Sequence, residues 1–244
     1  MKYEVTLNFD TIEISQLKWG PVQYRFVGLW DDSNPGYVRS HNMNMIGHNF
    51  PVSIRQREFE FLKETIIKYN LKNGFELATA FGVSATALGL GFKQTGGKLI
   101  TMDAYIEENL QDHRYDGANY QTYYEMNGWK SVNYLIEHFR LQKVVTPTVG
   151  WSPDDTGSVI AQHTTEKIDF VFLDAGHFSE QVMKDLYALK PFLDKEYVIA
   201  LHDYFETVYP DYLKEWLNKE FGTPVIGVPL PHGDNLTLIV NKKI

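Results

Sequence analysis

The stretch 224-PVIGVPLPHGDNLTLIV-240 contains two apolar, strand-like runs, Pro224 to Val228 and Leu236 to Val240. Only residues 229 to 235 separate them, whereas a crossover between parallel strands needs about a dozen residues or more. The two runs must therefore pair as an antiparallel hairpin. We expect the sheet of this protein to finish in a strand that runs against its neighbours.

Upstream of this hairpin, strand-like and helical patterns alternate from Gly74 onward. The strand candidates are five short apolar runs: 75–79, 98–103, 143–149, 169–174 and 197–202. Helical patterns lie between them, for example over Ser179 to Lys190, and another runs from Pro210 to Phe221 into the hairpin. This order predicts an α/β fold with a doubly wound, mostly parallel, seven-stranded sheet and a reversed last strand.

The first part of the chain has a different pattern. Tyr3 to Leu7 and Val22 to Val27 alternate apolar and polar residues, as half-buried strands do. We interpret residues 1–52 as an N-terminal β extension or lid. A helix is expected to open at Ser53, which has capping-box spacing to Gln56. Residues 53–244 then form the main domain, with an aromatic-rich insertion at 104–141 that either packs on the body or on a second subunit, or contacts a substrate.

Composition narrows the possible partners. The chain has 244 residues, 23 of them basic and 31 acidic, for a net charge of −8. This balance argues against a nucleic-acid or anionic-membrane partner. The absence of cysteine excludes disulfides, thiolate zinc sites and cysteine nucleophiles. No signal-peptide core or membrane-spanning apolar run is present in the sequence, so we expect a cytoplasmic protein.

The loop after the first of the five strands is built from small residues at positions 78, 80 and 82. Such residues let the backbone approach a ligand, and the helix that begins near Val83 would direct its free N–H groups at an anion. Asp103 ends the next strand, where a carboxylate commonly binds ribose hydroxyls. These features favour a nucleoside-type cofactor, although small residues at such a turn also serve close helix–sheet packing.

Polar residues end the fourth and fifth strands. Asp174 and His177 follow the fourth, and His202 and Asp203 follow the fifth. Adjacent parallel strands deliver such residues to one edge, where four ionisable groups are costly unless they are paired or bind a ligand or metal. Each residue alone has a structural explanation, such as capping a turn or forming an internal pair. The set of four indicates a functional site.

With these motifs the chain resembles class I S-adenosylmethionine-dependent methyltransferases. It is nearest the small-molecule O-methyltransferase-like group that includes the macrocin-type and cephalosporin-biosynthesis enzymes. The resemblance runs from Lys72 to the C-terminus and rests on 75-FELATAFGVS-84, Asp103, 172-FLDAGHFS-179 and 201-LHDY-204. It implies a Rossmann-like enzyme that methylates a hydroxyl of a small molecule. Two alternatives remain: a non-catalytic Rossmann-like binding or assembly protein, which alanine at 78 and 80 would suit, and another nucleotide-cofactor enzyme.

The resemblance also implies roles for individual residues. S-adenosylmethionine would be held by a set drawn from several strand ends: Glu76, Ala78, Thr79, Ala80, Gly82, Ser84, Asp103, Gly150, Trp151 and Asp174. Apart from the resemblance, we expect His177 or His202 to be the general base, because the pKa of histidine lies near neutrality. A metal at Asp174 and Asp203 would instead lower the pKa of the acceptor hydroxyl, so Asp174 is also a candidate catalytic residue. Asp174, His202 and Asp203 match the family's positions for a divalent metal, and the histidine leaves Mg²⁺, Mn²⁺ or no metal open. A homo-oligomer is a further possibility.

Overall fold

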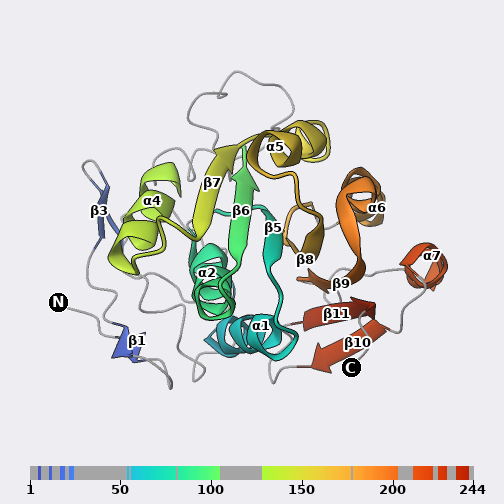
Figure 1. The fold of residues 1–244 in the computed structure, drawn as a ribbon, viewed down its shortest axis with the longest axis horizontal. Coiled ribbons are helices and arrows are strands. Elements are labelled where there is room, and N and C mark those ends of the chain that lie inside the picture. Colours follow the sequence, from blue (N-terminus) through green and yellow to red (C-terminus); the bar gives the residue numbers. More distant parts are fainter. Residues whose placement is uncertain are drawn as a thin grey trace.

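The computed structural model of this chain describes residues 5–6, 11–12, 17–19, 22–24, 54, 56–80, 82–104, 128–176, 178–202, 211–221, 225–229 and 235–241. Its centre is a seven-stranded sheet in the order β10-β11-β9-β8-β5-β6-β7 (Figure 1). The strands are β5 (Asn73–Leu77), β6 (Lys98–Asp103), β7 (Val145–Val149), β8 (Ile168–Leu173), β9 (Leu193–Leu201), β10 (Val225–Pro229) and β11 (Asn235–Asn241).

The pairing of these strands confirms the predicted sheet. Strands β7, β6, β5, β8 and β9 pair in parallel. Strand β11 pairs antiparallel with β9, for example Thr237 with Leu201, and antiparallel with β10 on its other side. The reversed last strand lies between β9 and the edge strand β10, and its short connection to β10 requires these two strands to pair antiparallel.

Six α-helices of the described residues cover both faces of this sheet: α1 (Gln56–Lys68), α2 (Val83–Thr95), α4 (Gly128–His138), α5 (Thr156–His163), α6 (Ser179–Leu189) and α7 (Asp211–Phe221). Side chains of α1, α2 and α4 form one core cluster and those of α5, α6 and α7 another. Alternation along β8 supplies both, since Phe170 and Phe172 join the first and Val171 and Leu173 the second. This is the doubly wound arrangement.

Several element ends differ from the expected ones by a few residues. Helix α1 begins at Gln56, while the expected start, Ser53, lies outside the described residues. Helix α6 ends at Leu189 and continues as the short 3₁₀ helix η3 (Lys190–Phe192). Pro191 within η3 lacks the N–H that would extend an α-helix. Strand β9 begins at Leu193, four residues before the expected start, where Leu193 pairs with Ile168.

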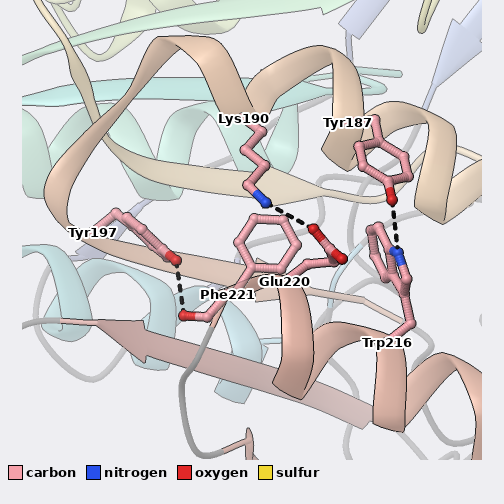
Figure 2. Close-up of polar contacts among 6 residues, drawn as sticks. All are labelled: Tyr187, Lys190, Tyr197, Trp216, Glu220 and Phe221. Carbon is pink, nitrogen blue, oxygen red and sulfur yellow. Dashed lines mark hydrogen bonds and ion pairs between the residues drawn. The ribbon is translucent and has the colours of Figure 1, made fainter.

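Helix α7 is attached to the sheet and to α6 by aromatic side chains (Figure 2). The Trp216 indole N–H donates to the Tyr187 hydroxyl over 3.1 Å, and the Tyr197 hydroxyl donates to the Phe221 carbonyl over 3.1 Å. Lys190 and Glu220 form an exposed ion pair at 2.8 Å. Buried aromatic area dominates this contact, since an exposed ion pair contributes roughly 0–1 kcal/mol.

The N-terminal region contains two short antiparallel pairs among its described residues. Strand β1 (Val5–Thr6) pairs with β2 (Thr11–Ile12), and β3 (Leu17–Trp19) pairs with β4 (Val22–Tyr24). The division at residue 52 and the lid remain predictions. Residues 105–127, most of the expected insertion, lie outside the described residues, and α4 forms its C-terminal part. Within the described chain, no helix has the length and apolar character needed to cross a bilayer.

Candidate functional site

The loop between β5 and α2 is the first part of the site, and its backbone is left-handed at three positions. Ala78, Ala80 and Gly82 have φ values of 70°, 47° and 88°. Alanine rarely adopts this region, which costs roughly 1–2 kcal/mol per residue. Two hydrogen bonds hold the loop against β6: Ala78 N–H donates to the Met102 carbonyl and Ala80 N–H to Asp103 Oδ2. The alanines thus keep the loop shape for which glycine is the usual residue.

Gly82 ends this loop and precedes the first turn of α2. A Cβ atom at this position would lie 3.0 Å from the Val132 Cα of α4. The positive φ and the close approach of α4 both require glycine here. The N-terminus of α2 therefore packs directly against α4. Within α2, the Thr86 hydroxyl donates to the Gly82 carbonyl.

Glu76 lies on β5, just before the β5–α2 loop, and its side chain is fully buried. The Thr101 hydroxyl donates to its Oε2 atom, and Thr79 shares a hydrogen bond with Thr101. Its Oε1 atom makes no hydrogen bond of good geometry to any described residue. Burial raises the pKa of Glu76 to about 8; the Ser84 and Thr101 hydroxyls oppose this rise, and the charges of Asp174 and Asp103 add to it. Three acids from adjacent strands therefore face one region.

Glu76→Gln should flatten the pH dependence of folding stability. The folded pKa of about 8 exceeds the ordinary value of 4.5 for a glutamate, so stability is highest below pH 4.5 and is lost as the pH rises toward 8. At pH 7 the loss amounts to about 3 kcal/mol, which the variant would recover. Urea unfolding between pH 5 and pH 9 measures the slope. Glu64→Gln, at an exposed position of α1, is the control, and equal slopes for Glu76→Gln and the wild type would refute the assignment.

The ends of β6 and β7 form the next part of the site. The Asp103 carbonyl accepts the Gly150 N–H over 2.9 Å, so the loop after β7 is joined to the end of β6. A Cβ atom at Gly150 would lie 2.8 Å from the Met102 sulfur. Trp151 N–H donates to Asp155 Oδ2 over 2.8 Å. Asp103, Gly150 and Trp151 are thus brought to the same edge as the β5 loop, as the sequence predicts.

Asp174 and His202, at the ends of β8 and β9, are in direct contact. His202 Nδ1 lies 3.0 Å from Asp174 Oδ1. On the other side of the ring, His202 Nε2 lies 3.2 Å from Glu58 Oε2 of α1, whose side chain is 1% exposed. Phe172 packs edge-on against the imidazole. The ring therefore stands between two carboxylates, and both nitrogens can donate only if the imidazole is protonated.

The metal prediction is not tested by this arrangement. Asp174 and His202 direct their donor atoms at each other, and no three potential metal-ligating side chains of the described residues converge on one point. The third expected ligand, Asp203, lies outside the described residues, as does the candidate base His177. Because one of the three expected ligands lies outside the described residues, the metal site stays a prediction.

Two residues of this region were not expected from the sequence: Glu58 on α1 and Asp185 on α6. Both are buried. Each interrupts an apolar helical stripe, since Glu58 precedes Leu62 by one turn and Asp185 adjoins Leu186. A charge within such a stripe must find a partner on folding. An acid within an apolar helical stripe is therefore the sequence signal that could have found these two residues. The pattern does not reveal which partner each acid contacts.

Comparison with known proteins agrees with this geometry. The model of a protein family described as "Methyltransferase domain" matches residues 75–204. No curated protein matches the chain by sequence. The fold is similar to that of the O-methyltransferase TomG from Streptomyces achromogenes, solved in complex with SAM, at 13% identity and a TM-score of 0.56 over 78% of this chain and 82% of that one.

Two further solved structures have the same fold. An O-methyltransferase from Bacillus cereus, in complex with SAH, is 15% identical with a TM-score of 0.56, covering 81% of this chain and 84% of that one. The SAH-bound methyltransferase PaMTH1 from Podospora anserina is 15% identical with a TM-score of 0.55, covering 80% and 83%. At these identities the likeness establishes the fold.

Proposed function

Because the chain belongs to the methyltransferase-domain family, whose model spans residues 75–204, we propose that it transfers a methyl group from S-adenosylmethionine to a hydroxyl of a small molecule. The observation that carries this proposal is the convergence of Glu76, Asp103 and Asp174 on one edge of the sheet beside the strained β5–α2 loop. A cationic cofactor with ribose hydroxyls suits such an acidic edge. When bound, it supplies an activated methyl group for in-line displacement.

The residues present fit this cofactor. Glu76 has a buried oxygen, Oε1, without a well-formed hydrogen bond, and an ammonium group would supply one. Asp103 lies at the β6 end, where a carboxylate binds ribose hydroxyls. The loop backbone keeps positive φ at Ala78 and Ala80, so the alanines do not argue for a non-catalytic relative. Gly150 and Trp151 would border the adenine.

The acceptor hydroxyl must lose a proton, and two histidines are candidates for the base. His202 has a carboxylate facing each ring nitrogen. Both nitrogens are therefore directed at Glu58 and Asp174, and neither is free to take a proton from the hydroxyl of the methyl acceptor. This geometry favours His177 as the general base, a role that stays a prediction. Catalysis would then consist mainly of placing the acceptor oxygen in line with the methyl group and removing its proton.

Calorimetry with S-adenosylhomocysteine tests the cofactor, and NAD serves as the control nucleotide. We expect micromolar binding of the first and no heat from the second. Binding of NAD alone would support a different nucleotide enzyme, and silence from both would support a non-catalytic protein. Transfer of labelled methyl groups into a small-molecule extract tests the acceptor class, because methyl ethers survive mild alkali whereas methyl esters do not. Label in an alkali-labile product would contradict O-methylation of a hydroxyl.

A further inference from the structure

Asp185 is a carboxylate with no exposed surface in the middle of α6. Its neighbours on the same face of the helix are Val182, Leu186 and Leu189, all buried. An aspartate in such a stripe costs free energy unless polar groups surround it. The position therefore needs an explanation that packing alone does not supply.

The contacts of Asp185 lead to the loop after β7. Its Oδ1 atom accepts hydrogen bonds from the Ser152 hydroxyl and, over 2.9 Å, from the Gln181 side-chain amide. The same amide nitrogen also donates to the Ser152 carbonyl over 3.3 Å. Ser152 thus has both its side chain and its backbone bound to α6. Trp151, the preceding residue, is held on its other side by Asp155.

Gln181 also contacts the loop after β8. A Cβ atom at Gly176 would lie 2.6 Å from the Gln181 Cγ atom, so the Gly176 backbone packs directly on this side chain. Gly176 lies two residues beyond Asp174. The Gln181 and Asp185 pair, one turn apart on α6, therefore contacts two of the loops that border the site.

The charge of Asp185 is not needed for these contacts to form. Asparagine has the same shape, and its Oδ1 atom could accept the same two hydrogen bonds. Burial raises the pKa of Asp185 to about 6, although the hydrogen bonds from Ser152 and Gln181 and the charge of Lys184 each lower it. Its second oxygen, Oδ2, has no hydrogen-bond partner among the described residues. The carboxylate thus lowers stability near neutral pH, while its charge strengthens the bond to Ser152.

We propose that Asp185 is a positioning residue that, through Ser152, sets the Gly150–Trp151 wall on the adenine side of the cofactor site. This rests on the proposed function. Asp185 does not itself touch the cofactor in this proposal. Its charged hydrogen bond holds Ser152, and Ser152 in turn places the backbone of the two residues before it.

The test compares Asp185→Asn and Ser152→Ala in the full chain. Hydrogen bonds to a charged group are worth enough that either change should weaken S-adenosylhomocysteine binding by about tenfold. The double variant should bind no more weakly than Ser152→Ala, because Ser152→Ala already removes the hydrogen bond that Asp185→Asn weakens. The affinity for methylthioadenosine, which keeps the adenine but lacks the amino-acid part, should fall by the same factor. Glu180→Gln, an exposed change on the same helix, should leave binding unchanged.

A spectroscopic readout separates positioning from a purely structural role. The emission of Trp151, obtained by difference from Trp151→Phe, should shift in Asp185→Asn without any ligand, while the melting temperature stays equal or rises. Unchanged binding and unchanged Trp151 emission in both single variants would overturn the inference. If the wild type binds no S-adenosylhomocysteine, the proposed function fails. The emission of the unliganded variants then still decides whether Asp185 controls this loop.

Discussion

Replacing His202 with alanine should destabilise the folded protein by about 4 kcal/mol, because it deletes a buried ring and leaves two acids without the polar group that lies between them. The imidazole separates the carboxylates of Glu58 and Asp174, at 3.2 Å and 3.0 Å from its two nitrogens. Alanine would leave these acids across a cavity. Denaturant unfolding at neutral pH measures the loss of unfolding free energy.

Two further variants define the cause of this loss. His163→Ala, at the exposed end of α5, should change stability by less than about 0.5 kcal/mol. Glu58→Gln added to His202→Ala should recover part of the loss, because it removes one of the two facing charges. A His202→Ala variant as stable as His163→Ala would show that the contacts of His202 with Glu58 and Asp174 do not stabilise the fold.

Asp103→Ala should lower S-adenosylhomocysteine affinity by at least about 100-fold, since it removes two interactions of a charged group. One is the proposed bond to ribose. The other is the observed bond from Ala80 N–H to Asp103 Oδ2, at 2.8 Å, which holds the left-handed loop. Calorimetry on the wild type and the variant measures the change.

Asp103→Asn separates these two contributions. Its amide oxygen can still accept the Ala80 N–H, so the loop should persist and the loss should be about tenfold. Asp194→Ala, at an exposed position of β9, is the matched control and should bind as the wild type does. If Asp103→Ala retained full affinity, the ribose role of Asp103 would be wrong.

The sheet was predictable because its signals are local. Apolar runs of strand length and the short 229–235 connection depend only on neighbouring residues and on the reach of the chain. The predicted β6 agrees with Lys98–Asp103 at both ends. The errors of a few residues elsewhere, as at the start of β9, arise where pairing continues beyond the apolar run.

The candidate site was predictable only in part. Parallel strands end at one edge, so the meeting of Asp174 with His202 follows from their positions after β8 and β9. Glu58 and Asp185 were missed because they belong to helices. The partner of a helical side chain depends on how the helix is rotated and packed against the sheet, which helical periodicity alone does not specify.

The sequence by itself therefore determined the α/β class, the reversed last strand and the set of acids at the strand ends, because backbone periodicity and connection length are properties of short segments. Only the tertiary structure decided that Ala78 and Ala80 take a glycine-like conformation. Their positive φ values are held by hydrogen bonds to Met102 and Asp103 of the neighbouring strand. It also placed Glu58 against His202 and Asp185 against Ser152, since such contacts form only when distant segments pack together.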